Sequence, residues 1–520
     1  MPHSIRSLWR TRHAPALVVA AVGCIVYAAW QPPTTDLAVV QFRVELFRRG
    51  PFSVWNNQWF GGHHTTTYLL SPVLAFLIGV VGLGVVSVLA GAWFGSVLVH
   101  LLTDAHPTLH RPRLAAVALT FGLLTSLYGG RTTFLLGAAI GIATLCGALA
   151  GRFWLTSGLV VLTSVASPVA GVFVALIGCA VVCAHALRFR IGVVMVVGSL
   201  VPIGLLAVLF AEGGDFPFPT GGVVNALIAT GLVAVLGWRF RAVRWAALGY
   251  VVFCVLCAAV ANPVGGNAAR FAALTAPVAV VMLAEMTFTW VAVLAAPLLL
   301  MQLAPISMAV AGDRAQTEAS FYAPLLATLS SHSAPLRVEV VPVATHGEAN
   351  FVASRFPIAR GWHRQLDRKY NGLFYRGQLD PQEYESWLRD LGVGFVAIAN
   401  TPLDVGGVTE ARLLANPPQY LREIHRDTVW RVFEVTPAPS LVDGAATLLA
   451  IDNDSFTIRA RSGGPVTVKV RFSPWFELTE GAGCVRQGPG GWTVVDAKAG
   501  IVRVAAQLSV GALWHRHGSC

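Results

Sequence analysis

Charged residues are scarce in this chain, and no lysine precedes Lys369. Only 12% of the 520 residues are charged, 55% are apolar, and the mean hydropathy is +0.64. Soluble globular domains carry about 25% charged residues, so this composition excludes an ordinary soluble protein. It predicts an α-helical integral membrane protein.

The charges that do occur are unevenly distributed. Residues 1–310 contain 16 arginines and six acidic residues, whereas residues 311–520 contain 21 basic and 20 acidic residues. The arginines of the first part stand in short clusters between apolar runs, which is the arrangement that orients helices in a bilayer. The net charge of +11 therefore reflects membrane topology, and we expect no nucleic-acid partner.

Apolar runs of membrane-spanning length dominate residues 1–310. A spanning helix needs about 20 mainly apolar residues, and we expect about eleven such helices. A further apolar stretch at 68–82 is short and contains Pro72, so we interpret it as an interfacial helix. A twelfth span there would instead reverse the topology of everything after it. The expected spans are residues 14–31, 84–103, 113–129, 132–150, 153–167, 169–187, 191–211, 221–238, 244–261, 270–286 and 288–307.

Arginine placement sets the expected orientation in the cell membrane. The basic N-terminus, MPHSIRSLWRTRHAP, is followed by no convincing cleavage site, so we expect an uncleaved first helix with a cytoplasmic N-terminus. With eleven spans, most loop arginines fall on the cytoplasmic side and residues 311–520 become extracytoplasmic. The cytoplasmic arginines are Arg111, Arg113, Arg152, Arg188, Arg190, Arg239, Arg241 and Arg244.

Two arginines depart from this pattern, because Arg131 and Arg270 fall at outer helix ends. Each could extend its charge to the membrane surface while its stem stays among apolar groups. Each could also bind an anionic ligand, and in that case we expect both to approach one polar site that faces the first loop.

The C-terminal part alternates apolar and polar residues as β-strands do. LRVEVVPVA, GFVAIAN and VWRVFEV predict strands, and PQEYESWLRDLG predicts a helix that starts at Pro381. We expect a mixed α/β domain over 311–440 and a small β-sandwich over 441–520, after a membrane domain over 1–310. Cys484 and Cys520 could form a disulfide in an oxidising compartment, while the six other cysteines lie in apolar runs as packing residues.

The first loop, residues 31–68, is unusually polar for so apolar a chain. Asp36 follows the first predicted span closely, and a carboxylate near the membrane surface can act as a general base for a hydroxyl group. The alternative is that Asp36 caps an amphipathic helix, on which Arg43 and Glu45 would also lie. Spacing alone does not choose between these interpretations.

The segment WNNQWFGGHH within this loop combines side chains that commonly contact sugars. Trp55 and Trp59 offer stacking faces, Asn56 and Asn57 offer paired donors and acceptors, and the glycines permit close approach of the backbone. His63 and His64 could contact a phosphate oxygen. Adjacent histidines point in different directions in most backbones, so a divalent metal is possible but poorly supported.

These features together resemble the GT-C superfamily of polyprenyl-phosphate-sugar-dependent glycosyltransferases. The resemblance depends on the early aspartate, a W-N-x-x-W/F-G-G-H-like turn, a Y-x-x-S-P segment, about a dozen spans and an outer C-terminal domain. Its specific motifs are the first loop, GGR at 129–131, SPVAG at 167–171 and GGNAARF at 265–271. More narrowly, the chain is similar to multispan membrane proteins of actinobacteria whose tails carry stretches like FPIARGWHRQLDRKYNGLFYRG.

The resemblance implies inverting transfer of a sugar from a polyprenyl-phosphate donor to a cell-envelope glycan or lipid at the outer membrane face. Asp36 matches the catalytic base, and Arg131, Arg270 and Asn267 become the expected donor-phosphate contacts. The expected substrate contacts are Arg43, Glu45, Trp55, Asn56, Asn57, Trp59, His63 and His64. Metal-dependent members of the superfamily have a clear second acidic residue, whereas Glu45 is the only other carboxylate near Asp36 in this sequence. The resemblance therefore implies no certain cofactor, and a divalent metal is doubtful.

Two other classes of protein compete with the enzyme. A non-catalytic scaffold could keep the same fold and bind a glycan or a partner protein through its outer domain. A lipid-linked-sugar transporter would need a polar route across the bilayer, but Glu285 is the sole carboxylate within a predicted span. Transport is therefore the weaker of these alternatives.

Overall fold

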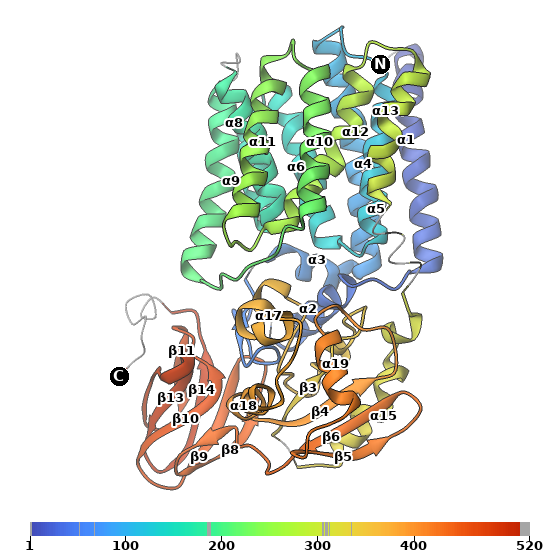
Figure 1. Cartoon of the computed structure of the whole chain (residues 1–520). Coiled ribbons are helices and arrows are strands. Elements are labelled where there is room, and N and C mark those ends of the chain that lie inside the picture. Colours follow the sequence, from blue (N-terminus) through green and yellow to red (C-terminus); the bar gives the residue numbers. More distant parts are fainter. Residues whose placement is uncertain are drawn as a thin grey trace. The chain divides into compact units, whose positions relative to one another are not determined.

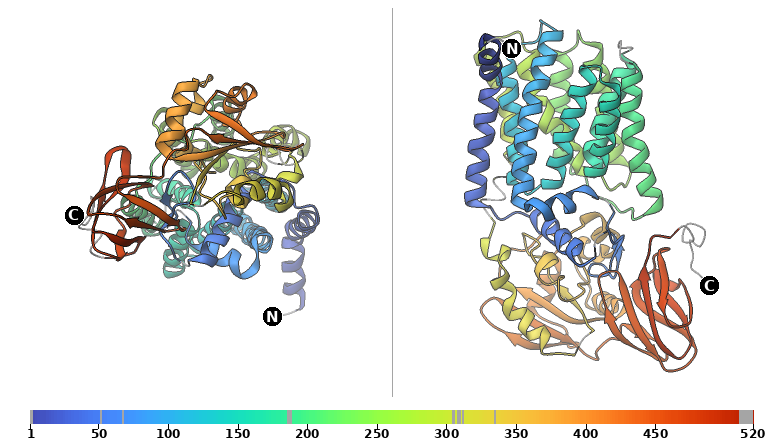
Figure 2. Two further views of the ribbon diagram at one scale, coloured as in Figure 1. Left: turned by 90° about the horizontal axis from the view of Figure 1, so that it is seen from below. Right: turned by 180° about the vertical axis from the view of Figure 1, so that it is seen from behind.

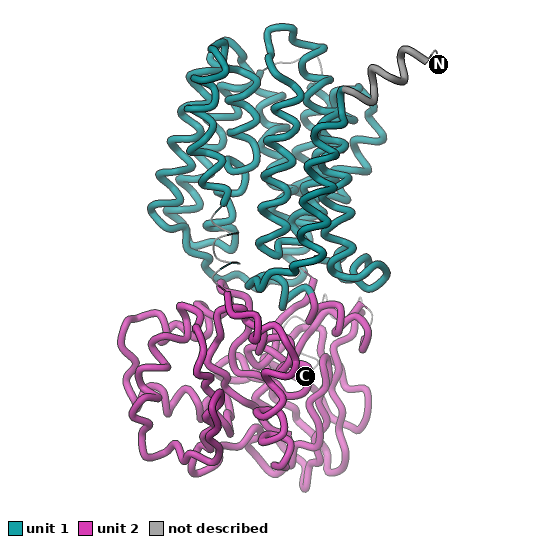
Figure 3. Tube along the Cα trace, turned by 90° about the vertical axis from the view of Figure 1, so that its right-hand side faces the viewer, with its two compact units in different colours: residues 1–40, 67–311 teal, residues 41–66, 312–520 magenta. Residues whose placement is uncertain are grey.

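A computed structural model describes residues 3–50, 52–66, 68–184, 189–303, 306, 310, 312–333, 335–509 and 520. The chain divides into two compact units, which Figure 3 shows in different colours. Unit 1 comprises residues 1–40 and 67–311, and unit 2 comprises residues 41–66 and 312–520. The sequence division placed the whole first loop with residues 1–310, but the structure assigns residues 41–66 to the C-terminal unit.

Unit 1 is a bundle of apolar helices, as its composition predicts (Figure 1). Six of the described helical segments are long and apolar enough to cross a membrane: α1 (Arg12–Trp30 of His3–Trp30), α4 (Val80–Ala105), α6 (Thr132–Leu149), α9 (Phe189–Leu209), α11 (Arg241–Ala259) and α12 with the preceding turn η1 (Gly265–Leu283). Five shorter apolar helices accompany them: α5 (Pro112–Tyr128), α7 (Phe153–Ala166), α8 (Pro168–Cys183), α10 (Thr220–Leu236) and α13 (Phe288–Gln302).

These helices coincide with the eleven apolar segments that the sequence predicts, within a few residues at each end. The last residues of the predicted span 169–187 lie outside the described residues. Arg188 of the expected arginine clusters also lies outside them. The described residues thus include six helices of membrane length and composition, as a multi-pass membrane protein requires.

The short apolar stretch after the first loop forms a separate helix, α3 (Leu70–Ile78). Its nine residues span about 14 Å at 1.5 Å per residue, which is half of the hydrocarbon thickness of about 30 Å. Gly79, with a φ of 77°, ends α3 immediately before α4 begins. The length of α3 therefore agrees with an interfacial helix.

Glycine allows the helices of unit 1 to pack closely. A Cβ atom at Gly91 of α4 would lie 2.7 Å from Leu123 Cδ1, and one at Gly95 would lie 2.6 Å from Leu119 Cδ2. Small residues have the same role at many helix contacts in membranes, where dispersion forces between tightly packed helices replace the hydrophobic effect. On the outer surface of α9, by contrast, Val201 and Leu205 are more than half exposed, as lipid-facing side chains are.

The first part of unit 2 contains a four-stranded sheet with the order β3-β4-β6-β5. β3 and β4 pair in parallel and the other pairs are antiparallel. Helix α18 begins at Pro381 as predicted, because Asp380 accepts hydrogen bonds from the N–H groups of Gln382 and Glu383. The strands are β3 (Arg337–Val340), β4 (Val393–Ala399), β5 (Leu421–Arg426) and β6 (Trp430–Val435); the helices are α15 (Ala319–Ser330), α16 (Glu348–Phe351), α17 (Arg364–Tyr370), α18 (Pro381–Leu391) and α19 (Val408–Ala415).

The second part of unit 2 contains two four-stranded antiparallel sheets that enclose one apolar core (Figure 2). Their strand orders are β12-β13-β10-β7 and β11-β14-β9-β8. Cys484 and Cys520 form a disulfide, a pairing that the sequence left open. The strands are β7 (Val442–Asp443), β8 (Ala446–Ile451), β9 (Ser455–Ala460), β10 (Gly464–Arg471), β11 (Phe476–Glu480), β12 (Gly483–Gln487), β13 (Trp492–Ala497) and β14 (Gly500–Ala506).

Candidate functional site

Three charged side chains from separate segments of unit 1 converge on one point. The Asp36 carboxylate lies 3.7 Å from Arg131 Nε and 3.8 Å from Arg270 Nη2. The three side chains are between 21% and 30% exposed, so they are partly removed from solvent but still accessible to a ligand. We call this group the Asp36 cluster.

A glycine turn between α5 and α6 places Arg131 beside Asp36. Gly130 has a φ of 73°, and a Cβ atom there would lie 2.3 Å from Thr34 Oγ1 and 3.0 Å from the backbone nitrogen of Leu37. Only glycine permits both this conformation and this approach. The GGR motif therefore acts as a contact between the α5–α6 turn and the segment that carries Asp36.

A second glycine turn places Arg270 at the start of α12 (Ala269–Leu283). Gly265, with a φ of 42°, lies so close to Phe216 that a Cβ atom would overlap its carbonyl group. The Asn262 side chain accepts hydrogen bonds from the N–H groups of Val264 and Gly265 at 2.9 and 2.8 Å. These contacts fix the turn from which α12 and Arg270 begin.

Asp36 stands directly before α2 (Leu37–Arg49), at the position of a helix cap. Within the described residues, however, its carboxylate accepts no hydrogen bond from the first turn of α2; its contacts there are the ion pairs with Arg131 and Arg270. A capping aspartate would accept a bond from one of the first N–H groups. The geometry therefore favours the charge cluster over the capping interpretation.

The two arginines retain hydrogen-bonding capacity. Neither guanidinium group donates a hydrogen bond to a residue that the structure describes, since both distances to Asp36 exceed hydrogen-bonding range. The Arg270 guanidinium carbon also lies 5.2 Å from the ring centroid of Phe134, a cation–π contact that the sequence did not indicate.

The charges of the Asp36 cluster do not balance, because two guanidinium groups face one carboxylate. Arg131 lies in the turn outside α5 and α6, where removal from water and then the nearby Arg270 lower its pKa to about 10. It is still protonated at neutral pH, so one positive charge is in excess. The group can therefore accept a further anion such as a phosphate.

Asn267, the third expected phosphate contact, lies in the turn η1 (Gly265–Ala268) one turn before Arg270. Its backbone N–H group donates to the Val264 carbonyl at 2.9 Å. Its half-buried side chain makes no hydrogen bond with the described residues. The structure thus places Asn267 in the turn that precedes Arg270, without joining it to the cluster.

The predicted sugar-binding segment lies in unit 2 as a hairpin, β1 (Trp55–Asn56) and β2 (His63–His64). Trp55, Asn56, Asn57, His63 and His64 are all buried. Trp55 Nε1 donates to Asn57 Oδ1 at 2.7 Å, and Asn57 Nδ2 donates to the carbonyls of Asp452 and Ser455. Asn56 Nδ2 and His63 Nε2 lie 3.0 Å apart. These contacts hold the hairpin to the sandwich.

Trp59, at the tip of the same segment, is 1% exposed. Its ring stacks on Phe42 at 4.5 Å between centroids, and Nε1 donates to the Ala349 carbonyl at 3.0 Å. A Cβ atom at Gly361 would lie 2.8 Å from the Trp59 ring. The contacts of Trp59 are therefore those of a core residue of unit 2.

Arg43 and Glu45 lie on the part of α2 that belongs to unit 2. Arg43 Nη2 is 3.0 Å from His363 Nε2, and burial followed by the Arg43 charge holds the pKa of His363 well below its usual range. His363 is therefore neutral and can accept this bond. Glu45 pairs along the helix with Arg48 and Arg49 at 3.7 and 3.0 Å, so neither residue joins the Asp36 cluster.

Unit 2 contains a buried polar network whose full set of partners the sequence pattern does not reveal. His346 Nδ1 is 3.0 Å from Glu348 Oε1, and His346 Nε2 is 3.4 Å from Asp404 Oδ2. Arg364 pairs with Asp404 through two bonds of 2.7 and 2.6 Å. The sequence stretch that contains Arg364 mixes aromatic and ionic side chains, which is typical of a functional segment. The partners of Arg364 and His346, however, come from segments whose local sequence pattern does not reveal these contacts.

One group of three potential metal ligands lies within the described residues: Cys484, Asp496 and Cys520. Its two cysteine sulfur atoms are joined in the disulfide.

Comparison of the sequence with protein-family models gives no match, and no curated protein matches it. The arguments for a function therefore come from the Asp36 cluster itself.

Proposed function

We propose that the protein is an inverting membrane glycosyltransferase. It transfers a sugar from a polyprenyl-phosphate donor to a glycan or lipid of the cell envelope at the extracytoplasmic face. The convergence of Asp36, Arg131 and Arg270 is the observation that supports this proposal most strongly, because the resemblance gives these residues complementary parts of one reaction.

The chemistry requires one proton acceptor and one site for a leaving phosphate. The hydroxyl oxygen of the acceptor attacks the anomeric carbon, and Asp36 takes the hydroxyl proton. The bond between that carbon and the phosphate oxygen breaks, and the electron pair leaves with the polyprenyl phosphate. Arg131 and Arg270 stabilise the negative charge that develops on this phosphate.

The charge and geometry of the cluster suit such a ligand. Guanidinium groups bind phosphate through pairs of parallel N–H donors, and neither arginine donates to a described residue. A phosphate that joins the cluster also compensates its excess positive charge. Partial burial strengthens these interactions relative to bulk water.

The arginine distribution and the disulfide support an extracytoplasmic location for unit 2. Among the described residues, eleven apolar helices precede residue 312 when the short helix α3 is set aside, and an odd number of crossings from a cytoplasmic N-terminus would place unit 2 outside. A disulfide between Cys484 and Cys520 also requires an oxidising compartment in most organisms. Both observations agree with a reaction on the outer side.

A strain that lacks the gene tests the function directly. We expect one envelope glycan to lose a sugar and the matching polyprenyl-phosphate sugar to accumulate, both restored by the wild-type gene. Mass spectrometry of the extracted lipids and glycans measures both and identifies the sugar. An unchanged envelope with unchanged lipid-linked sugars would contradict transfer and favour a scaffold.

A further inference from the structure

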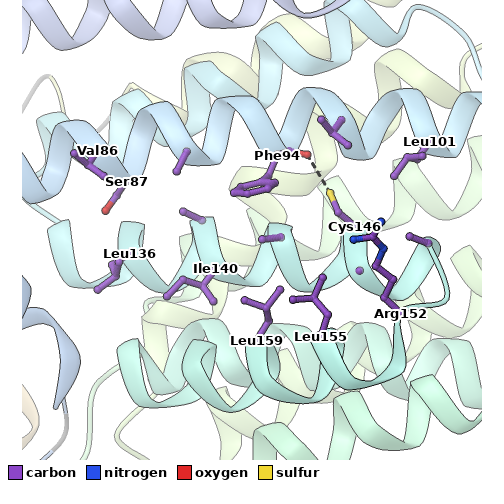
Figure 4. A pocket seen from close by; sticks show the side chains of 16 residues that line it. Val86, Ser87, Phe94, Leu101, Leu136, Ile140, Cys146, Arg152, Leu155 and Leu159 are labelled. Atoms are coloured by element: carbon purple, nitrogen blue, oxygen red, sulfur yellow. Dashed lines mark hydrogen bonds between the residues drawn. The ribbon is translucent and has the colours of Figure 1, made fainter. Parts of the chain in front are cut away.

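An apolar groove of about 480 Å³ runs along the helices α4, α6 and α7 of unit 1 (Figure 4). On α4 it extends from Val86 to Leu101, a distance of about 22 Å at 1.5 Å per residue. Its lining consists of Val86, Ser87, Ala90, Phe94, Val97, Leu101, Leu136, Ala139, Ile140, Ala143, Cys146, Gly147, Ala150, Arg152, Leu155 and Leu159.

Small side chains on α6 leave the space that forms the groove. Ala139, Ala143 and Gly147 recur every four residues along α6 and are buried, while Phe94 and Leu155 beside them are 36% and 47% exposed. This side of the bundle therefore faces the hydrocarbon of the bilayer, and a flexible apolar chain can fill the hollow.

The interior of the groove offers no unsatisfied polar group. Ser87 Oγ donates to the Leu83 carbonyl at 2.7 Å, and Cys146 Sγ lies 3.3 Å from the Phe94 carbonyl. Helical Ser and Cys side chains that bond their own or neighbouring backbone do not need a ligand. Arg152 is the one charged residue of the lining.

Arg152 lies directly before α7, at the end of the groove. Figure 4 shows its side chain directed toward Cys146. Arg152 is exposed, and its guanidinium group makes no hydrogen bond or ion pair with a residue that the structure describes, whereas its backbone bonds to Gly147 and Thr156 within the helix ends. Other loop arginines of unit 1 do have protein partners: Arg239 pairs with Glu285, and Arg111 donates to the Ala284 carbonyl at 2.8 Å.

We propose that this groove is a binding site for an anionic glycerophospholipid, with one acyl chain in the hollow and its phosphate on Arg152. A hydrocarbon hollow that ends at an uncompensated cation has the two chemical features of such a lipid. The site is distinct from the Asp36 cluster, because Arg131 precedes α6 and Arg152 follows it. The lipid stabilises the contacts among α4, α6 and α7.

Native mass spectrometry of the full-length protein from nanodiscs of mixed phosphatidylglycerol and phosphatidylcholine tests the charge. We expect retained lipid to be mainly phosphatidylglycerol, and Arg152→Gln to reduce that preference about fivefold, which corresponds to about 1 kcal/mol for one arginine at the membrane surface. Arg113→Gln removes an exposed arginine elsewhere and serves as the matched control. Equal retention of both lipids by the wild type would overturn the proposal, as would an unchanged preference in Arg152→Gln.

A second variant tests the hollow without altering charge. Ala143→Leu places a larger side chain in the floor of the groove, so we expect both lipids to be lost, with cross-linking of a photoreactive phosphatidylglycerol to α4, α6 and α7 reduced in parallel. Cross-links that map to other helices in the wild type would contradict the site. So would a dimer that retains no lipid, because a second copy of the chain would then cover the groove.

Discussion

At the scale of single residues, Asp36 differs from an ordinary helix cap in the charges that face it. A capping aspartate needs only the N–H groups of the next turn, whereas Asp36 faces Arg131 and Arg270. The sequence indicated all three as candidates, because two arginines departed from the inside pattern. The sequence could not show that the three side chains lie close together, because their positions depend on two glycine turns that are far apart in the chain.

His346 in unit 2 is the clearest case of a residue whose partners fix its charge. Burial alone would lower its pKa, but Asp404 and Glu348 outweigh burial and raise the pKa to about 9. His346 is 5% exposed as a side chain, so solvent screens these pairs little. Its positive charge therefore stabilises the folded unit.

We predict that this stabilisation depends on pH. The folded-state pKa of about 9 exceeds the unfolded value of about 6.5, so the contribution is complete below pH 6.5 and is lost as pH rises to 9. Its full size is on the order of 3 kcal/mol. His346→Asn accepts the φ of 54° at this position, and we expect it to lower the apparent Tm at pH 6 much more than at pH 9.5.

The difference between wild type and variant isolates His346 from other titrating groups. His425→Asn removes a half-buried histidine that pairs with Asp427 at 3.0 Å and serves as the control, with little expected change at any pH. An equal loss of Tm for His346→Asn at pH 6 and pH 9.5, measured by intrinsic fluorescence, would show that His346 contributes packing rather than charge.

At the scale of elements, the turn between α5 and α6 carries the geometry of the Asp36 cluster. Tyr128 anchors this turn by donating to the Gly23 carbonyl of α1 at 2.9 Å. Gly130 then brings the turn against Thr34 and Leu37. The position of Arg131 therefore depends on a residue that has no side chain.

We predict that Gly130→Ala displaces Arg131 and reduces transfer by about 10–100-fold, because small misplacements of reacting groups have effects of this size. The variant should also lower the apparent Tm, since alanine is disfavoured at a φ of 73°. Gly158→Ala in α7 meets nothing within 4 Å and should leave transfer unchanged. Wild-type transfer by Gly130→Ala would exclude the turn from the site.

The first loop shows where local sequence reasoning fails for an element. Its polar and aromatic residues suggested one continuous site, but residues 41–66 belong to unit 2. Trp59 packs against Gly361 and Asn57 bonds to the backbone near Asp452. Buried tryptophan and asparagine have the same local pattern as a sugar-binding surface, so only the tertiary contacts could distinguish them.

At the scale of the whole molecule, hydropathy was sufficient to locate the helices of unit 1. The apolar segments 132–150 and 153–167 correspond to α6 and α7 within one residue, because a Gly-Arg break precedes each of them. Alternation likewise located strands such as β4 and β6. The sequence raised the pairing of Cys484 with Cys520 but left it open, and it did not indicate the division of the first loop, because both depend on contacts between distant segments.

The proposed orientation makes a prediction for the complete chain. We expect protease added to intact spheroplasts to remove an epitope tag placed after Cys520, because the proposed orientation places residues 312–520 outside the cytoplasm. A tag at the N-terminus should be removed only after permeabilisation, which makes it the control. Protection of the C-terminal tag in intact spheroplasts would refute the orientation and with it the outer-face reaction.

The most direct test of the central claim is the activity of Asp36→Asn in the deletion strain. Asparagine keeps the size of the side chain but cannot take the acceptor's proton, so we expect transfer to fall by about 10²–10⁴-fold while the amount of protein in the membrane stays normal. Asp36→Glu keeps the charge but moves the carboxylate, so it should restore little transfer if the base must be positioned. Asp104→Asn breaks an exposed Asp–Arg pair with the same 3.7 Å separation and should behave as wild type. Normal glycan from Asp36→Asn would contradict the catalytic assignment.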